Sequence, residues 1–300
     1  MKPPTEPTKD DCCNSGCNPC IFDVYDTHLK LYEKYLNQDC ACDSYNVTDY
    51  GISQLEYRKF YLYHIIQISD QQKMLFFQKS KQYSQKVSWK PGDHFLIKHT
   101  SDNDISCTRA YTPIKLKINS DGPLDYDFLI VIKKYSNGLV SNYLFHLNIG
   151  QETAWRGPYG SYNVEPNKFS KIIMLAQGTG VAPFVSIIQN ILNNDEDMTR
   201  IILYYCCQDL NEILFRDELY EFNSYWNFSY KIFLSNTSEE SYMNKKYNEP
   251  LVNSKFNVLE LDYLKSHSNN QYLLCGSVQF MKEYEVVLKN GSYSDHIILF

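Results

Sequence analysis

The stretch KIIMLAQGTGVAPFVSIIQNIL, residues 171–192, decides the fold expected for this chain. Its apolar start, Lys171–Ala176, predicts a buried strand, and Pro183–Leu192 predicts an amphipathic helix. The glycines of Gly178-Thr179-Gly180 permit a tight turn between them, and the first N–H groups of the helix favour an anion such as a pyrophosphate. Pro183 suits the first helical turn, where its missing donor is not needed. The third glycine of the usual dinucleotide motif is absent, so a purely structural turn is the alternative.

Strands and helices continue to alternate up to the C-terminus. Further strands are expected at Arg200–Tyr205, Tyr230–Leu234, Gln271–Cys275 and His296–Phe300, and further helices at Leu210–Phe222 and Met281–Leu288. This order predicts an α/β domain with a parallel sheet over residues 167–300. Gly178, Cys206 and Cys275 then lie at the carboxyl ends of strands, where ligands of such sheets gather. For Cys206 and Cys207, a role as small buried apolar residues is the favoured interpretation.

Residues 51–166 are expected to form a small antiparallel β-barrel. Strands are predicted at Phe60–Ser69, Lys73–Gln78, His94–His99 and Asp127–Lys134, and Pro and Gly mark the turns between them. Helical periodicity occurs there only in Asn142–Leu147. The boundary between the two domains is expected near Glu165–Phe169.

Composition and charge narrow the function classes. The 300 residues are 43% apolar and 21% charged, and their net charge of −6 argues against a nucleic-acid-binding surface as the main function. No run approaches the ~18 apolar residues of a transmembrane helix, and the N-terminus has no apolar signal core. A soluble intracellular protein, in the cytoplasm or associated with an organelle, is therefore expected. Residues 1–50 differ from the rest, because they hold 9 Asp and Glu against 4 Lys, and six of the ten cysteines.

A second motif, Arg109-Ala110-Tyr111-Thr112-Pro113, has the chemistry of a flavin site. An Arg can clamp a phosphate with two hydrogen bonds, a Tyr can pack against a flat ring, and a Thr hydroxyl can bond a heterocycle nitrogen. The motif is followed in order by Gly138-Leu139-Val140-Ser141, by Arg156-Gly157-Pro158-Tyr159-Gly160, by the Gly178 turn and by Cys275-Gly276.

These ordered motifs resemble the ferredoxin-reductase superfamily and, within it, the NADH–cytochrome b5 reductase family. The segment Glu212–Leu219 is similar to that family as well, and the resemblance runs from about residue 55 to the C-terminus. It implies a ferredoxin-reductase-like fold, with an antiparallel FAD-binding β-barrel followed by a parallel-sheet domain that binds the nicotinamide nucleotide. The short Cys-rich segment at residues 1–50 resembles the "oxidoreductase-like" segment found before the reductase body in the cytochrome b5 reductase-like subgroup.

The resemblance implies a role for individual residues. Arg109 would face the FAD pyrophosphate, and Tyr111 and Thr112 would line the isoalloxazine, with Thr112 near N5. Other flavin contacts implied by the family pattern are Val131, Lys133, Tyr135, Gly138, Leu139, Val140 and Ser141, the last four as donors to phosphate. The nicotinamide nucleotide would be held by Gly178, Thr179, Gly180, Pro183, Cys275 and Gly276. Thr112 and Cys275 would be the catalytic residues, with Cys275 near the point of hydride transfer.

The implied reaction passes a hydride from NAD(P)H to flavin N5 and electrons on to a one-electron acceptor, most plausibly a haem protein such as cytochrome b5. Three positions depart from the family: Ala182 replaces the usual Thr, Ser277 replaces a Pro-rich turn, and Asn236 stands where NADH enzymes commonly have Asp. NADH is the expected donor, and Asn236 leaves NADPH open. The alternative function is a degenerate reductase scaffold whose Cys-rich segment binds a metal or a partner.

Cys12, Cys13, Cys17 and Cys20 are the candidate metal ligands of that segment. Four thiolates suit zinc or an iron–sulfur cluster, although these four lie within nine residues, closer than in the usual pair of separated knuckles. A disulfide, redox sensing and unstructured thiols are the alternatives. The following stretch, Ile21–Leu36, predicts a helix whose face of Tyr25, Leu29, Tyr32 and Leu36 docks on the body.

Overall fold

The structure is a computed structural model that describes residues 3–13, 20–37, 51–82, 85–101, 103–116, 125–236, 247, 250–264, 269–291, 293 and 296–300. The chain divides into two compact units. One comprises Met1–Gln67 and Gln71–Tyr162, and the other comprises Ile68–Asp70 and Asn163–Phe300. No helix in the described part of the chain has the length and apolar character needed to cross a membrane.

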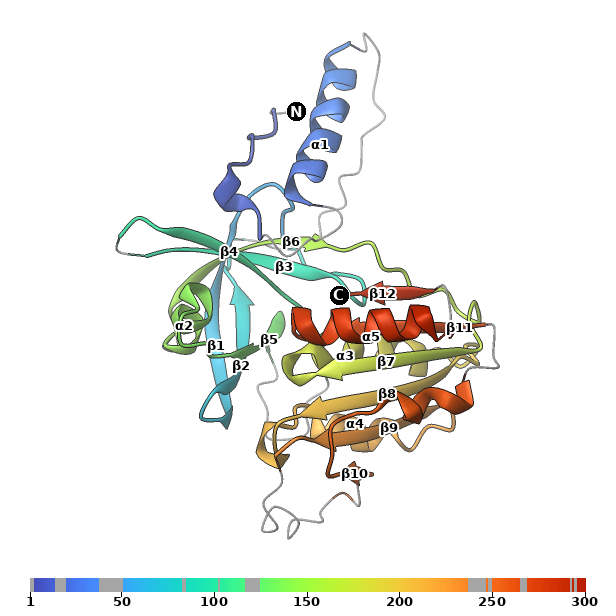
Figure 1. Ribbon diagram of the computed structural model, residues 1–300. Coiled ribbons are helices and arrows are strands. Elements are labelled where there is room, and N and C mark those ends of the chain that lie inside the picture. Colours follow the sequence, from blue (N-terminus) through green and yellow to red (C-terminus); the bar gives the residue numbers. More distant parts are fainter. Residues whose placement is uncertain are drawn as a thin grey trace. The chain divides into compact units, whose positions relative to one another are not determined.

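The first unit contains a six-stranded antiparallel sheet in the order β4-β3-β6-β1-β2-β5 (Figure 1). Its strands are β1 (Arg58–Ser69), β2 (Gln72–Lys79), β3 (His94–Thr100), β4 (Ser106–Tyr111), β5 (Phe128–Lys133) and β6 (Glu152–Tyr159). Ile114, just after β4, exchanges two backbone hydrogen bonds of 2.9 Å with Leu129 of β5. This bridge joins the two edge strands and closes the sheet, which confirms the predicted barrel.

Aromatic side chains fill the barrel. Phe60, Phe77, Phe95, Phe128 and Trp155 are each fully buried, and their ring centroids lie 5.1–5.4 Å apart in mostly edge-to-face pairs. Such pairs add to the free energy gained by burying the rings. Helix α2 (Leu139–Phe145) covers one end of this core through Val140 and Leu144. The helix expected at Asn142–Leu147 therefore begins three residues earlier, after Gly138.

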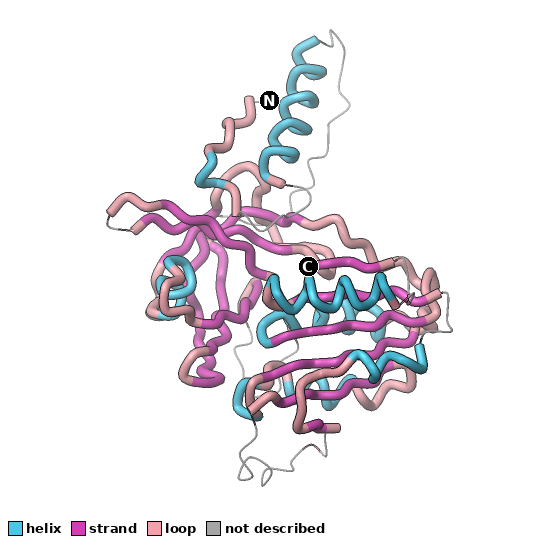
Figure 2. The backbone as a smooth tube through the Cα atoms, in the orientation of Figure 1, coloured by secondary structure: helices cyan, strands magenta, loops and turns pink. Residues whose placement is uncertain are grey.

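The second unit is a parallel sheet in the order β10-β9-β8-β7-β11-β12, as predicted for residues 167–300. The strands are β7 (Lys171–Gln177), β8 (Arg200–Cys207), β9 (Phe228–Leu234), β10 (Leu251–Val252), β11 (Asn270–Cys275) and β12 (Ile297–Leu299). Helices α3 (Ala182–Leu192) and α4 (Arg216–Phe222) cover one face, and α5 (Val278–Asn290) covers the other (Figures 1 and 2). A short 3₁₀ segment, η5 (Val258–Leu264), precedes β11.

The helix expected over Leu210–Phe222 is interrupted. A short 3₁₀ turn, η3 (Leu210–Glu212), is followed by α4, and between them Phe215 adopts a left-handed conformation with φ of 56°. Its ring is 2% exposed. Packing of this ring into the core selects a backbone conformation that a large side chain rarely adopts.

The N-terminal segment belongs to the barrel unit. It contains a 3₁₀ turn, η1 (Lys9–Asp11), and the helix α1 (Ile21–Asn37). Ile21 and Val24 at the start of α1 are buried in an apolar cluster with Leu96 of β3 and Tyr159 of β6. The helix therefore docks on the body, but through Ile21 and Val24. Of the face expected to dock, Tyr25, Leu29 and Tyr32 are only half-buried, and the Leu36 side chain lies outside the described part.

Candidate active site

The carboxyl edge of the parallel sheet brings the predicted nucleotide-site residues together. Gln177 of β7 pairs with Cys206 of β8, and Ala176 of β7 pairs with Cys275 of β11. The chain moves from β7 to β8 and β9 on one side and returns to β11 on the other, so the strand order reverses between β7 and β11. Open parallel sheets bind ligands at such a switch point. Gly178 follows β7 and Gly276 follows β11, so both stand at this position.

The two glycines of the Gly178–Gly180 turn differ in what a side chain would meet there. Gly178 has φ of +54°, and a methyl group there would meet nothing within 4 Å, so the backbone faces open space. A methyl group on Gly180 would stand 2.3 Å from the Cys275 carbonyl oxygen and 2.8 Å from the Gly276 nitrogen. Gly180 thus serves the packing of the turn η2 (Gly178–Val181) against the end of β11.

The turn also leads directly into α3, so the switch point offers the start of a helix. Ala182 is the first helical residue and Pro183 lies in the first turn, both buried. The first N–H groups of a helix have no acceptor within it, and they carry a partial positive charge. In α3, however, the Ala182 N–H donates to the Thr179 carbonyl and Pro183 has no N–H, so the donors that fit a nucleotide phosphate are those of the turn η2, beside the open space at Gly178.

The Cys275 thiol is held at the C-terminus of the chain. It donates a hydrogen bond to the Phe300 carbonyl at 3.8 Å, and the Phe300 N–H donates to the Leu274 carbonyl at 3.0 Å. Burial raises the pKa of Cys275 to about 12. The thiol therefore keeps its proton at neutral pH and provides a small apolar contact. The ring of Phe300 packs edge-on to Phe184 at 5.7 Å.

Gln177, which the sequence reasoning did not single out, ties this edge together. Its Oε1 accepts hydrogen bonds from the Ser277 N–H at 3.1 Å and the Ser277 hydroxyl at 2.7 Å. The same Ser277 oxygen accepts from the Phe280 N–H at 3.3 Å and caps α5. A serine directly before an amphipathic stretch is the signal for this cap. Ser277, a departure from the family pattern, therefore has a local structural role.

Cys206 and Cys207 follow the favoured interpretation. Burial raises the pKa of Cys206 to about 12 and raises that of Cys207 further. Both side chains lie in the α/β unit, where Cys206 packs against the apolar cluster behind α5. They are protonated, inert thiols within the sheet.

In the barrel, β4 places the flavin motif on one face. The Thr108 hydroxyl and the Ala110 side chain contact the N-terminal segment, and alternate residues of a strand point to opposite faces. Arg109 and Tyr111 therefore face away from that segment. The Arg109 side chain is exposed, and its Nη1 donates to the Thr108 carbonyl at 2.8 Å.

Tyr111 and Thr112 are half-buried at the end of β4. The Tyr111 ring packs edge-on to the buried Trp155 at 6.1 Å. Burial raises the pKa of Tyr111 well above its ordinary value, so the phenol stays neutral. A neutral phenol beside an exposed guanidinium, Arg109, fits a flat ring joined to a pyrophosphate.

Strand β5 and the turn after it carry the remaining flavin candidates. Val131 is buried, Lys133 is half-buried and Tyr135 is 59% exposed. A methyl group on Gly138 would stand 2.2 Å from the Ser141 hydroxyl, so a side chain here would displace that hydroxyl from its place in the turn. Leu139 and Val140 then form the first turn of α2.

Two side chains of α2 fasten that turn. The Ser141 hydroxyl donates to the Gly138 carbonyl at 3.2 Å and accepts from the Tyr135 N–H at 3.3 Å. The Asn142 amide donates to the carbonyls of Tyr135 and Gly138 at 2.8 and 2.9 Å. The Ser141 hydroxyl, implied as a phosphate donor, is thus hydrogen-bonded within the turn, and the backbone N–H groups of Leu139 and Val140 are the donors presented there.

The candidate metal ligands divide into different environments. The Sγ atoms of Cys12 and Cys20 lie 3.9 Å apart, whereas Cys13 is 2% exposed in the apolar cluster with Leu96 and Tyr159. Cys17 lies outside the described residues. Among the residues that are described, no group of three or more His, Cys, Asp or Glu side chains is arranged to hold a metal ion.

Comparison with known proteins identifies the family. The family models for the oxidoreductase FAD-binding domain, the oxidoreductase NAD-binding domain and the N-terminal segment of oxidoreductase-like proteins match residues 59–164, 174–285 and 1–41. A human protein named NADH-cytochrome b5 reductase-like is 30% identical over 308 residues, which span 99% of this chain and 94% of that protein. The chain belongs to the NADH-cytochrome b5 reductase-like family. A mouse protein of the same name is 30% identical over 75% of this chain and 71% of that protein.

Solved structures confirm the ferredoxin-reductase-like fold. The cytochrome b5 reductase domain of Ulva prolifera nitrate reductase matches with a TM-score of 0.67 and 22% identity. The match covers 83% of this chain and 99% of that domain. A flavohemoglobin from Malassezia yamatoensis has a TM-score of 0.69 and 16% identity, over 92% of this chain and 65% of that one. In this reductase-like chain, the barrel is therefore the FAD-binding domain, and the parallel-sheet unit is the NAD-binding domain.

Proposed function

We propose that this chain oxidises NADH and passes the electrons to a one-electron acceptor, a haem protein such as cytochrome b5. The observation that carries the proposal is the register that brings Gly178 and Cys275 to the same edge at the switch point of the parallel sheet. When bound, NADH supplies a hydride to N5 of FAD, and FAD supplies single electrons to the acceptor. The chain's residues bind and orient these groups and exclude water.

Each residue of the barrel site has a proposed task. Arg109 binds the FAD pyrophosphate, and Tyr111, supported from behind by Trp155, packs against the isoalloxazine. Thr112 donates a hydrogen bond near N5. Contacts with the flavin and its phosphates are further assigned to Val131, Lys133, Tyr135, Gly138, Leu139, Val140 and Ser141.

In the other unit, Gly178 and Thr179 of the turn η2 bind the nucleotide phosphates. Gly180, Pro183 and Gly276 give this edge its shape. The Cys275 thiol lies beside the switch point and keeps its proton, so it orients the nicotinamide by contact and does not act as a base. Thr112 and Cys275 are thus the residues proposed to stand at the reacting atoms.

The first test compares Arg109→Ala with Lys59→Ala. Arg109 is exposed, and its charge-assisted bonds to a phosphate contribute about 1.5–3 kcal/mol, so the substitution should weaken FAD binding by about 10- to 100-fold. Lys59 is a matched cation of the same barrel, in an exposed ion pair with Glu152 at 2.9 Å, and its loss should leave FAD affinity unchanged. Equal FAD affinity of the two variants contradicts the assignment.

Asn236 stands where a charge would discriminate between NADH and NADPH. It follows β9 at the carboxyl edge, is exposed, and its N–H donates to the Gln208 carbonyl at 2.7 Å. An amide makes no charge repulsion with a 2′-phosphate. We expect NADH to be preferred, and Asn236→Asp to lower kcat/KM for NADPH about tenfold further by repulsion while NADH changes little. Preference for NADPH in the unaltered protein contradicts this part of the proposal.

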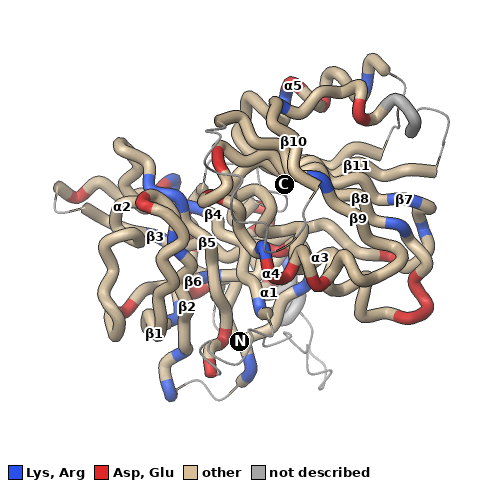
Figure 3. The backbone as a smooth tube through the Cα atoms, turned by 90° about the horizontal axis from the view of Figure 1, so that it is seen from below, with Lys and Arg blue, Asp and Glu red and all other residues tan. Residues whose placement is uncertain are grey.

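The acceptor is tested by following the reduction of ferric cytochrome b5. Blue Lys and Arg segments and red Asp and Glu segments are scattered over both units in Figure 3, so we consider local cation pairs as the places for an acidic acceptor. Lys73 and Lys134 form such a pair, with Nζ atoms 4.1 and 5.2 Å from the centre of the Phe145 ring. NADH-dependent reduction that weakens with salt supports a haem-protein acceptor. Flavin reduction by NADH without transfer to cytochrome b5 refutes that acceptor.

A degenerate scaffold is the second candidate, and it rests on Ala182 and Ser277. Purified protein that binds no FAD, even after reconstitution, would establish it. The cap that Ser277 gives to α5 explains that residue without any loss of the nucleotide site.

A further inference from the structure

Two thiols of the N-terminal segment meet where that segment packs on the barrel. The Sγ atoms of Cys12 and Cys20 lie 3.9 Å apart, and both residues are partly exposed thiols at the edge of the apolar cluster. We propose that Cys12 and Cys20 are a redox-active dithiol, which a low-molecular-weight disulfide such as oxidised glutathione converts into an intramolecular disulfide. Neither cysteine is among the residues assigned to the flavin or to the nucleotide.

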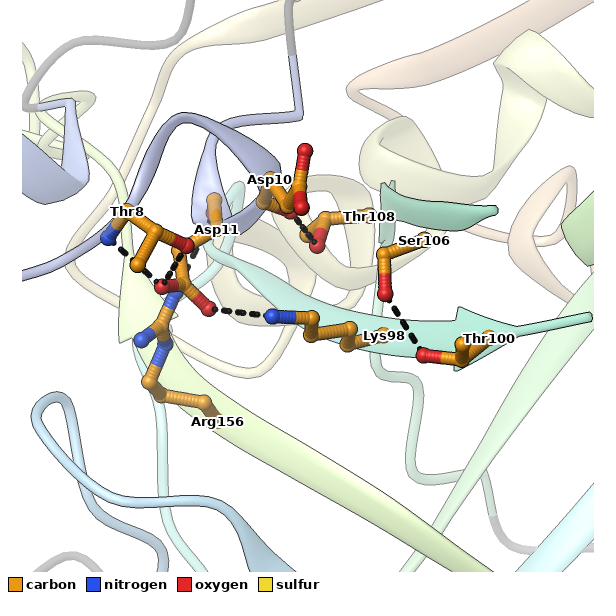
Figure 4. A network of polar contacts seen from close by, with 8 residues as sticks. All are labelled: Thr8, Asp10, Asp11, Lys98, Thr100, Ser106, Thr108 and Arg156. Atoms are coloured by element: carbon orange, nitrogen blue, oxygen red, sulfur yellow. Dashed lines mark hydrogen bonds and ion pairs between the residues drawn. The ribbon is translucent and has the colours of Figure 1, made fainter. Parts of the chain in front are cut away.

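The chain before Cys12 is fixed to three strands of the barrel by polar contacts (Figure 4). Lys98 of β3 forms an ion pair with Asp11 at 3.3 Å, the Thr108 hydroxyl of β4 donates to the Asp10 carbonyl at 2.6 Å, and Arg156 of β6 donates to the Asp11 carbonyl at 3.2 Å. Arg156 is 4% exposed. Asp11 is the residue directly before Cys12, so the position of Cys12 is set by the barrel.

Within this anchor, the Asp11 carboxylate is held by its own turn as well. It accepts hydrogen bonds of 2.8 Å from both the N–H and the hydroxyl of Thr8. Burial alone would raise the pKa of Asp11, but the bonds from Thr8 and the charge of Lys98 lower it below the ordinary value. Thr8 and Lys98 thus hold the Asp11 carboxylate from two sides.

Cys20 is fixed independently, by the start of α1. Its N–H donates to the Asp23 carboxylate at 2.9 Å, and its carbonyl accepts from the Val24 N–H at 3.0 Å. Ile21 and Val24 are 3% and 6% exposed, packed against the barrel. Both thiols are thus held on one surface by separate anchors, and their approach does not depend on chance encounters of a free chain.

The distance favours a disulfide. A disulfide has its sulfurs about 2.05 Å apart, so closing the gap from 3.9 Å needs a shift of about 2 Å, within reach of side-chain rotation. One thiol loses its proton and attacks oxidised glutathione, releasing one glutathione thiol and forming a mixed disulfide. The second thiol then attacks the protein sulfur of that mixed disulfide and releases the second glutathione. Overall, two protein thiols are oxidised and one glutathione disulfide is reduced to two thiols.

Cys13 is the neighbouring thiol that the geometry excludes. It is 2% exposed and surrounded by Ile21, Val24, Leu96 and Tyr159. Buried cysteines of this kind exchange slowly because the attacking reagent does not reach them.

The test uses the full chain and two matched variants. Cys13→Ser/Cys17→Ser keeps Cys12 and Cys20, and Cys12→Ser/Cys17→Ser keeps Cys13 and Cys20. Each is treated with excess oxidised glutathione and blocked with N-ethylmaleimide, and the intact protein and its tryptic peptide 10–30 are weighed. This readout does not depend on flavin content or activity.

The first variant should lose the mass of two hydrogen atoms in this peptide, and intramolecular disulfide should exceed glutathione adduct by about tenfold or more. The second variant should gain one glutathione on Cys20 instead. The proposal is overturned if the first variant only gains glutathione, if the second forms the intramolecular bond equally well, or if both remaining thiols of the first variant are held by a stoichiometric zinc ion and resist exchange.

Discussion

Replacing Gly180 by Ala tests whether the turn after β7 must contact the end of β11. The added methyl group would lie 2.3 and 2.6 Å from the carbonyl oxygen and carbon of Cys275 and 2.8 Å from the Gly276 nitrogen. All three are backbone atoms. Cys275 belongs to β11, which is paired with β7 over its whole length, so these atoms do not move away without a shift of the sheet.

The expected loss of stability follows from that contact. Overpacking costs about 1–3 kcal/mol, and contact with fixed backbone places Gly180→Ala near about 3 kcal/mol. Alanine also restricts the unfolded chain, which stabilises the folded state by about 0.4–1 kcal/mol. The net loss of stability of Gly180→Ala is therefore about 2 kcal/mol. Gly178→Ala is the matched control. It meets nothing within 4 Å but has φ of +54°, so it should cost about 1 kcal/mol or less.

Hydrogen exchange of the β7 and β11 amides, measured by mass spectrometry, reads the stability of this unit directly. Gly180→Ala should speed exchange in both strands more than Gly178→Ala does. NADH binding should instead be weakened more by Gly178→Ala than by Gly180→Ala, relative to their effects on stability. The reason is that the Gly178 methyl group enters the space assigned to the nucleotide. Exchange in β11 that Gly180→Ala leaves unchanged refutes the packing role of this glycine.

Further predictions concern four single side chains. Burial raises the pKa of Asp93 to about 6, so the folded state disfavours the charged carboxylate. The contribution of Asp93 to stability therefore falls as pH rises from about 4 to about 6. Asp93→Asn retains the hydrogen bond from the Lys90 N–H and should gain about 2 kcal/mol of stability at pH 7, measured by urea unfolding. His94 acts in the opposite direction. Burial lowers its pKa to about 4, so protonation of this imidazole opposes folding. The Asp93→Asn variant should therefore lose stability only towards acid pH. Ser277→Ala should cost about 1 kcal/mol through loss of the α5 cap, seen as a lower melting temperature. In native protein at pH 8, iodoacetamide should modify Cys275 much more slowly than a free thiol, because its raised pKa leaves little thiolate; modification at the rate of a free thiol contradicts that pKa.

The parallel-sheet unit was predictable because its signals are local. The sequence pattern predicts a strand at Lys171–Ala176, a turn at the two glycines and a helix at Pro183–Leu192, in that order. The switch point follows from the alternation of strands and helices alone. Phe215 shows the limit. Its left-handed conformation interrupts the expected helix because the ring packs into the core, and no local preference indicates this.

The barrel was harder to predict from the sequence. β6 carries Gly157 and Pro158, which as punctuation indicate a turn, yet both lie within the strand. The helix at Leu139–Phe145 was placed too late, because its N-cap is Gly138 and a glycine in a β-rich stretch also indicates a turn. The start of α2 was therefore missed because Gly138 directly precedes it.

Site residues were found where their chemistry is explicit and missed where it arises from folding. Arg109 and Cys275 carry recognisable motifs. Gln177 carries none, and its two bonds from Ser277 exist because β7 and β11 are neighbours although a hundred residues separate the partners in sequence. The docking face of α1 was assigned to the wrong stripe for a similar reason: the surface formed by Leu96 and Tyr159 selects which side chains are buried.

The most direct test of the reductase function is an absorbance spectrum of freshly purified protein, followed by anaerobic addition of NADH. The account predicts a flavin band near ~450 nm that bleaches with NADH and bleaches less readily with NADPH. A protein that shows no flavin band after incubation with FAD, or whose bound flavin stays oxidised with excess NADH, would contradict it.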